Sequence, residues 1–358
     1  MVEKTVFGTL PSGERAHVYT LENGGVTVRV SDFGATLLGI DVPDARGEVA
    51  DVVLGFADLA GYAGVNDAFY GATVAPVANR TAGAEVEVAG TVYHLIKNDS
   101  EVNNLHTDKV HGLHKRVWRA EASEDGEGGA KRVAFEIDIA DGDFGLPGNR
   151  RVSAAYELSA DGELTLSYRM DTDAPTFANI TNHGYFNLAG HASGSVEGQL
   201  VQIDAERFVP IDGTSIPTGE LRQVAGTPFD FRAPHAIGER IAVDDEQLKN
   251  ARGYDHCFCV DGYEPDAAPR HALHAEDPAS GRALDVYVTT PGIQLYTGNW
   301  LDDPDAKDGA AYTARSGFAV EPEFYPDCAH HAAWPQPVCT PDHPFTSTIR
   351  YRFSTVSE

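Results

Sequence analysis

Alternation of apolar and polar residues with a period of two constrains the fold of this chain most strongly. In residues 152–158 every second residue is apolar, and the same pattern returns in residues 164–170. Asp161-Gly162 lies between the two runs. Successive side chains of a strand face opposite sides, and Asp-Gly favours a tight turn. The segment therefore predicts a β-hairpin.

Similar runs recur along the chain, so most of it is expected to be strand. Further strands are predicted at residues 132–139, 283–289 and 349–353. Asp-Gly occurs six times, and 36 glycines and 20 prolines supply many more turns. Helical periodicity is confined to short stretches near residues 58–64 and 244–250. A parallel sheet needs longer helical crossovers, so the sheets should be antiparallel.

These patterns predict an all-β protein built as a large antiparallel β-sandwich. With 42% hydrophobic residues the chain can bury a sizeable core. No change in composition or Pro/Ser-rich linker divides it, so residues 1–358 are expected to form a single domain. The glycine- and acid-rich stretch 123–130 is expected to be a hairpin tip.

The balance of charge excludes several kinds of partner. Fifty-four acidic residues against 27 basic ones give a formal charge of −27. Such a surface repels phosphate backbones and anionic lipids, so neither nucleic acid nor a membrane is expected as a partner. It also disfavours anionic substrates unless a local basic pocket overrides it. The acidity fits ordinary solubility, and adaptation to a salty medium is the alternative.

Cysteine usage and the apolar segments point to a cytoplasmic protein. No apolar run approaches the ~18 residues that a membrane-spanning helix needs, and the N-terminus has no signal-peptide pattern. Four cysteines in 358 residues do not suggest a disulfide framework. Cys257 and Cys259 stand two apart in an expected strand and would face the same side. Without a second Cys/His pair at metal-binding spacing, buried thiols are the better interpretation than a metal site.

Two polar clusters are candidates for catalysis. His183 lies between Thr181-Asn182 and the aromatic pair Tyr185-Phe186. Polar neighbours can orient its imidazole and the aromatics can support an apolar sugar face, although a structural histidine is the alternative. Glu321 and Glu323 flank Pro322, which suggests a strand end or bulge. Desolvation would move such a carboxylate toward general-base service, and an exposed acidic edge is the alternative.

A base and an acid on separate strands could face each other across a sugar-sized gap, one accepting a proton while the other donates one. No nucleophile elbow, phosphate-binding loop or dinucleotide fingerprint occurs, so acyl chemistry and nucleotide cofactors are not indicated. The spaced histidines His106, His111 and His114 have Lys109, Lys115 and Arg116 close by, which disfavours a cation. Neither a metal nor another cofactor is expected.

Eight short segments, spread in order over nearly the whole chain, match motifs of one family. They are Ala78-Asn79-Arg80, Asn104-Leu105-His106, residues 112–118, residues 145–149, the T-N-H-x-Y-F-N-L-x-G run at 181–190, Gly253-Tyr254-Asp255-His256, the P-G-x-Q-x-Y-T-G-N run at 291–299, and Glu321 with Pro326-Asp327. By these segments the chain resembles the aldose 1-epimerases, also called galactose mutarotases. The resemblance implies the large supersandwich of that fold, and interconversion of the α and β anomers of a free aldose such as galactose or glucose.

The resemblance also implies a role for individual residues. Glu321 would be the general base at the anomeric hydroxyl, and His183 the general acid at the ring oxygen. The residues expected to bind the sugar are Asn79, Arg80, His106 and Asp255, with Gln294 and Tyr185 as candidates for the pocket wall. The substrate is then a small neutral sugar, handled without metal or cofactor by a monomer or homodimer.

Three departures from the family pattern bear on specificity. Thr107-Asp108 replaces the usual Gly-Gly, Ala75-Pro76 replaces Gly-Arg, and Glu323 stands where glutamine is common. Two further readings stay open. One is a related enzyme for a pentose, a disaccharide or a sugar phosphate. The other is a carbohydrate-binding sandwich without activity, although a lectin has no need of a histidine–glutamate pair.

Overall fold

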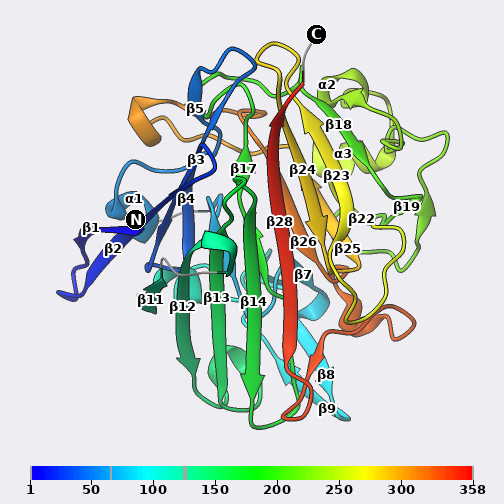
Figure 1. Ribbon diagram of the computed structural model, residues 1–358. Coiled ribbons are helices and arrows are strands. Elements are labelled where there is room, and N and C mark those ends of the chain that lie inside the picture. Colours follow the sequence, from blue (N-terminus) through cyan, green and yellow to red (C-terminus); the bar gives the residue numbers. More distant parts are fainter. Residues whose placement is uncertain (1, 65–66, 124–126, 357–358) are drawn as a thin grey trace.

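The computed structural model describes residues 2–64, 67–123 and 127–356. Strands dominate it, and three large sheets form its framework (Figure 1). Pairing within these sheets is antiparallel. The all-β antiparallel prediction is therefore confirmed.

The largest sheet has nine strands, and the C-terminal strand lies at its centre. In spatial order its strands are β11 (Arg119–Ser123), β12 (Lys131–Ile139), β13 (Arg150–Leu158), β14 (Leu164–Thr172), β28 (Phe345–Thr355), β24 (Arg282–Val288), β23 (Arg270–Glu276), β18 (Leu200–Ile203) and β21 (His235–Ala236). Figure 1 shows β28 in red between the green β14 and the yellow β24. The last strand of the chain thus joins two groups of strands from its middle.

A six-stranded and a five-stranded sheet complete the framework. The six-stranded sheet runs β17 (Tyr185–Phe186), β26 (Phe318–Glu323), β25 (Gly292–Tyr296), β22 (Asp255–Cys259), β19 (Arg207–Phe208) and β20 (Arg222–Gln223). The five-stranded sheet runs β1 (Val2–Thr9), β2 (Arg15–Asn23), β3 (Val26–Ser31), β4 (Thr36–Pro43) and β5 (Val49–Asp51).

Short strand pairs and single helical turns fill the connections. The pairs are β6 (Ala72–Val74) with β16 (Thr181–His183), β7 (Arg80–Thr81) with β10 (Asn104–Leu105), β8 (Glu85–Val88) with β9 (Thr91–His94), and β15 (Thr176–Phe177) with β27 (Val338–Cys339). The 3-10 turns are η1 (Ala82–Ala84), η2 (Leu113–Lys115), η3 (Glu127–Gly129), η4 (Asp143–Gly145), η5 (Lys307–Gly309) and η6 (Cys328–His330).

Helix is confined to three short α-helices within the described residues: α1 (Leu59–Ala63), α2 (Ile237–Arg240) and α3 (Glu246–Ala251). The side chain of Asp58 accepts a hydrogen bond from the Gly61 amide and caps α1. Asp245 caps α3 in the same way. Both helices lie where sequence periodicity predicts them, whereas α2 was not predicted. None of the described helices is long and apolar enough to cross a membrane.

The predicted hairpin is confirmed as β13 and β14, with Leu158 opposite Leu164 across the Asp-Gly turn. The three further predicted strands correspond to β12, β24 and β28, although β28 begins four residues earlier, at Phe345. Strands β11 and β12 pair directly, as expected for a hairpin. Part of its predicted tip, residues 124–126, lies outside the described residues.

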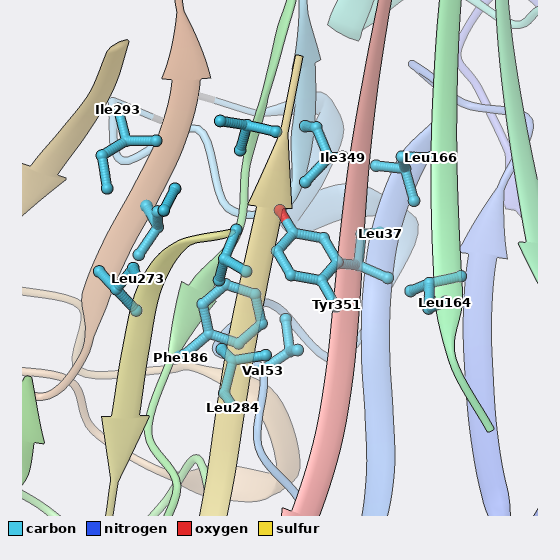
Figure 2. Packing of buried hydrophobic residues seen from close by; sticks show 14 of the residues in the cluster. Leu37, Val53, Leu164, Leu166, Phe186, Leu273, Leu284, Ile293, Ile349 and Tyr351 are labelled. Atoms are coloured by element: carbon cyan, nitrogen blue, oxygen red, sulfur yellow. The ribbon is translucent and has the colours of Figure 1, made fainter. Parts of the chain in front are cut away.

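One large apolar cluster lies between the sheets. It takes Leu164 and Tyr351 from the nine-stranded sheet, Phe186 and Ile293 from the six-stranded sheet, and Leu37 from the five-stranded sheet (Figure 2). Each of these five side chains is fully buried. Burying a side chain of this size stabilises the fold by about 1.5–3 kcal/mol. The inner faces of all three sheets therefore depend on a shared core, which holds the site strands at fixed separations.

A histidine–carboxylate cluster stabilises the nine-stranded sheet. The two ring nitrogens of His271 lie 2.7 Å from Asp204 and 3.1 Å from Asp285, and Nδ1 of His274 lies 2.8 Å from Asp285. The hydrogen bond with Asp285 raises the pKa of each histidine. Burial raises the pKa of Asp285, but the bonds from His271 and His274 outweigh it and hold this pKa below its usual range.

Asp285→Ala should lower stability most at mildly acidic pH. The contribution of His271 and His274 to the free energy of unfolding is complete below about pH 6.5 and is lost as pH rises through their raised folded pKa values. The contribution of Asp285 is lost only as pH falls below about 3.9. We expect a loss of about 1–2 kcal/mol at pH 5.5 and a smaller loss at pH 9. Thermal unfolding at both pH values measures it. Asp171→Ala, which removes an exposed partner of Arg169 in the same sheet, is the control. Equal losses at both pH values would contradict this assignment.

Candidate active site

The candidate residues meet at a cleft of about 400 Å³. Its lining comes from segments that are far apart in the sequence. The lining residues are Asp67, Ala68, Phe69, Asn79, Arg80, Leu105, His106, His183, Tyr185, Asp255, Tyr296, Trp300, Leu301, Asp302, Asp303 and Glu321. Two of these, Tyr296 and Glu321, belong to neighbouring strands β25 and β26, and Asp255 begins β22 on the other side of β25. Antiparallel pairing thus assembles the floor of the cleft.

His183 and Glu321 form a buried pair in this cleft. His183 ends β16 and is 5% exposed, while Glu321 lies in β26 and is 2% exposed. Nε2 of His183 lies 3.4 Å from Oε1 of Glu321. Nδ1 of His183 and Oε2 of Glu321 have no hydrogen-bond partner among the described residues. The pair therefore has capacity left to exchange protons with a bound molecule.

Burial governs the protonation of both groups. It raises the pKa of Glu321 well above its usual range; the nearby Asp255 adds to this rise and Arg80 opposes it. Burial also lowers the pKa of His183 to about 4. Each shift favours the neutral form, so the resting pair holds one proton on the carboxyl group rather than standing as an ion pair. One proton moved from Glu321 to His183 would create a base and an acid side by side.

Asn79 fixes the protonation of the second histidine. Its backbone N–H donates to Nδ1 of His106 over 3.1 Å, and its carbonyl accepts from the His106 amide. Because Nδ1 accepts, the ring proton lies on Nε2. Burial lowers the pKa of His106 well below the usual value, so the ring stays neutral. His106 is therefore a neutral N–H donor.

Arg80 and Asp255 add a charged pair to the cleft wall. Nη1 of Arg80 lies 3.9 Å from Oδ2 of Asp255, and Nε donates to Asp99 over 3.2 Å. The amide of Gln294 donates to Oδ1 of Asp255 over 2.7 Å. Gln294 is not among the residues that line the cleft, so the structure does not bring it to the pocket wall as expected. It orients Asp255 from behind instead.

Aromatic rings form the remaining wall. Tyr185 stacks on His183 with ring centroids 5.0 Å apart, and its edge meets Tyr296. Phe69 contacts the rings of His106 and His183. Trp300, which is 59% exposed, lies at the mouth of the cleft. Such a wall offers apolar surface to a ring-shaped ligand while the polar groups fix its orientation.

One group of three residues has the spacing of a metal site. Potential ligand atoms of His106, His183 and Glu321 all lie within 4.8 Å of one another. Nδ1 of His106, however, already accepts the Asn79 amide, and Nε2 carries the ring proton. A metal needs an unprotonated ring nitrogen with a free lone pair. His106 therefore does not fit as a ligand, and the remaining two residues make an incomplete set.

A larger hollow of about 760 Å³ lies elsewhere and contains none of the candidate residues. Its basic groups already have partners. Nζ of Lys307 donates to Asp51 over 2.6 Å and to the carbonyl of Leu38 over 2.9 Å. This hollow contains none of the residues assigned to catalysis or sugar binding.

Sequence reasoning located seven of the sixteen residues that line the cleft. His183, Glu321, Arg80, His106, Asp255, Asn79 and Tyr185 are all brought together. The expected sugar-sized gap between His183 and Glu321 is wrong, since their side chains are in direct contact. The alternative of an exposed acidic edge is also wrong, because Glu321 and Glu323 are both buried.

Several lining residues were missed. Tyr296 lies two residues after Gln294 in β25, so strand alternation could have found it. Phe69, Trp300 and Asp303 lie in loops, where no periodicity indicates direction. Thr107, one of the departures from the family pattern, has a structural role. Its hydroxyl donates to the Val77 carbonyl over 2.9 Å and accepts from the Val77 amide over 2.9 Å.

Comparison with known proteins agrees with the fold and cleft. Residues 17–352 match the aldose 1-epimerase family model. The chain is 38% identical to the human galactose mutarotase over 99% of its length and 98% of that protein. It is 35% identical to the Escherichia coli aldose 1-epimerase over 96% of both chains. A solved galactose 1-epimerase from Lactobacillus acidophilus superimposes with a TM-score of 0.85 at 26% identity, covering both chains completely.

These similarities extend over nearly the whole chain and include the cleft. The chain therefore belongs to the aldose 1-epimerase family of isomerases that act on carbohydrates, and aldose 1-epimerisation is its function.

Proposed function

We propose that Glu321 is the general base and His183 the general acid of this aldose 1-epimerase. The observation that supports this assignment is their direct contact at the floor of the cleft, 3.4 Å between Nε2 and Oε1. The anomeric hydroxyl and the ring oxygen of an aldose are bonded to the same carbon. An acid and a base that serve these two oxygens must therefore be neighbours, as they are here.

The proton transfers then balance over one cycle. Once its own proton has passed to His183, Glu321 takes the proton of the C1 hydroxyl as the C1–ring-oxygen bond breaks, and C1 becomes the aldehyde carbon. His183 gives its proton to the departing ring oxygen. Rotation about the C1–C2 bond presents the other face of the carbonyl. Ring closure reverses both transfers, so the pair ends the cycle as it began, and no cofactor is consumed.

We infer that the remaining polar groups hold a neutral sugar. Arg80, His106, Asp255 and Asn79 supply both donors and acceptors around the pair. Carboxyl groups outnumber basic groups in the cleft lining, where Arg80 is the only arginine or lysine among the residues that the structure describes. A phosphate would meet repulsion there, so a free aldose such as galactose or glucose fits better than a sugar phosphate. A pentose or a disaccharide is distinguished by polarimetry on freshly dissolved sugars.

Three broader inferences accompany this assignment. The shared core contains residues from Tyr19 to Tyr351, which supports a single domain over residues 1–358. All four cysteines are free and buried, which supports a reducing, cytoplasmic location. A monomer or homodimer remains our expectation.

Glu321→Gln and His183→Asn should each lower kcat by roughly 10²–10⁴-fold, because each removes one positioned proton-transfer group. The double variant should lose less than the product of the two single losses, since both groups act in the same ring opening. Coupled or polarimetric assays of α-galactose measure the rates.

His191→Asn provides the matched control, because His191 is a buried histidine outside this cleft. It should keep most of the activity. Full activity of either cleft variant would rule out the assigned pair. If the wild-type protein binds sugar but has no epimerase activity, a carbohydrate-binding role would be favoured.

Arg80→Ala should act mainly on KM. It removes a charged donor from the cleft wall and leaves Asp255 without its nearest cation. A charged hydrogen bond contributes about 1.5–3 kcal/mol, which corresponds to a KM rise of roughly tenfold to 100-fold. Steady-state kinetics measure the change, with Arg169→Ala on the exposed sheet surface as the control. An unchanged KM would place Arg80 outside the sugar-binding set.

Exhaustive chelation should leave activity intact. Among the described residues, only His106, His183 and Glu321 have the spacing of a metal site. The tautomer of His106 leaves no free ring nitrogen to bind an ion. Activity is compared before and after EDTA treatment and dialysis. Loss of activity that a divalent ion restores would show that His106 changes tautomer to bind a metal.

A further inference from the structure

A second buried carboxyl group lies directly behind the base. Glu323 is the last residue of β26 and is 0% exposed. Nδ2 of Asn79 donates to its Oε1 over 2.9 Å, and its Oε2 has no partner among the described residues. Glu321 lines the cleft, whereas Glu323 does not. The two acids thus occupy one strand but differ in their access to the cleft.

The surroundings of Glu323 contain more acid than base. Glu321 faces it from its own strand, Asp255 and Cys257 face it from β22, and Cys328 faces it from η6. Burial, followed by the charge of Glu321, raises the pKa of Glu323 well above its usual range. Arg80 is the basic group that opposes this rise, and this arginine already interacts with Asp99 and Asp255. Two adjacent buried carboxyl groups without a dedicated cation cannot both ionise near neutral pH.

Access to the cleft decides which of the two holds the extra proton. Water or sugar hydroxyl groups in the cleft can solvate an ionised Glu321. Glu323 has only the Asn79 amide, so its charge would be less well solvated. When one of the two acids ionises, Glu321 is therefore the one that loses its proton, and Glu323 keeps its own.

Asn79 connects Glu323 to the sugar-binding groups. Its side-chain amide donates to Glu323, its Oδ1 accepts from the Arg80 amide over 2.7 Å, and its backbone N–H sets the tautomer of His106. Asn79 also has a φ of 58°, in the left-handed region. The bond to Glu323 therefore anchors the side chain of Asn79, whose Oδ1 accepts from the Arg80 amide and whose backbone holds His106.

We propose that Glu323 is a positioning residue that stays a neutral carboxylic acid during catalysis, anchors Asn79, and leaves Glu321 free to ionise. The proposal rests on the assignment of Glu321 as the base. The Glu323→Gln substitution tests it directly, because glutamine is neutral and can accept the hydrogen bond from the Asn79 amide in the same way.

The first measurement is the pH dependence of kcat/KM for Glu323→Gln. If Glu323 is neutral, the acidic limb of the profile keeps its apparent pKa, because glutamine leaves the charge near Glu321 unaltered. If Glu323 is ionised in the working enzyme, the substitution removes a neighbouring negative charge, and the acidic limb moves down by about one unit or more. The second result overturns the proposal.

The second measurement separates anchoring from space filling. Glu323→Leu has a similar volume and is also neutral, but it cannot accept the Asn79 amide. We expect this variant to lose kcat/KM by roughly tenfold or more relative to Glu323→Gln, with a raised KM, since a buried donor is left unpaired. Equal activity of the two variants would show that Glu323 does not act through Asn79.

The third measurement does not depend on catalysis. A carboxyl group with a raised folded pKa takes up a proton on folding, so stability falls as pH rises from about 4.3 toward that folded value. Glutamine has no such dependence, and the Tm of Glu323→Gln should exceed that of the wild type by a margin that grows from pH 5 to pH 8. A difference in Tm that does not change with pH would show that Glu323 is not neutral in the folded protein. A growing margin together with fully active Glu321→Gln would mean that the assigned base is wrong, while Glu323 is still neutral.

Discussion

Burial of the Glu321–His183 pair is the constraint on which the rest of the site depends. Low polarity around the two groups disfavours both charges, so the resting site contains neither an ionised Glu321 nor a protonated His183. A proton-transfer enzyme benefits from this, because neither transfer then starts from a strongly stabilised ion. The same burial destabilises any further charge nearby. The charge of Arg80 is stabilised by Asp99 and Asp255 on either side of it, and His106 remains neutral.

Antiparallel sheet structure is what makes this burial possible. The cleft draws its polar residues from five separate segments, near positions 80, 106, 183, 255 and 321. None of these residues could be desolvated by its own neighbours in sequence. In the six-stranded sheet, Gln294 lies opposite Cys257 on one side and Glu321 on the other. That register sets the distance between the base and the strand that carries Asp255. The apolar cluster beneath the strands, including Ile293, holds the register, because a shift by one residue would turn Glu321 away from the cleft.

Sequence reasoning recovered much of this arrangement, and its failures have physical causes. The hairpin at 152–170 follows from alternation and an Asp-Gly turn, which are local properties. The cleft residues followed from motif resemblance, which identifies residue types without distances. For that reason the contact between His183 and Glu321 and the withdrawn place of Gln294 could not be foreseen. Both depend on side-chain directions set by pairing between distant strands. Phe69 and Trp300 escaped notice because loop residues show no period from which a facing side can be read.

The backbone around the cleft explains why so much surrounding structure is required. Phe69, Asn79, His106 and Thr107 all have φ values between 54° and 66°, in the left-handed region that residues with side chains rarely adopt. Each such residue costs about 1–3 kcal/mol and persists only where neighbouring contacts determine it. Here the contacts are mutual. Phe69 packs on His106, His106 and Asn79 exchange two backbone-anchored hydrogen bonds, and Thr107 bonds both polar groups of Val77. Strain in any one of these residues is therefore relieved only if the others move with it. That coupling keeps the proton donor of His106 and the amide of Asn79 in place before a sugar arrives, so the binding energy of the sugar need not be spent on ordering them.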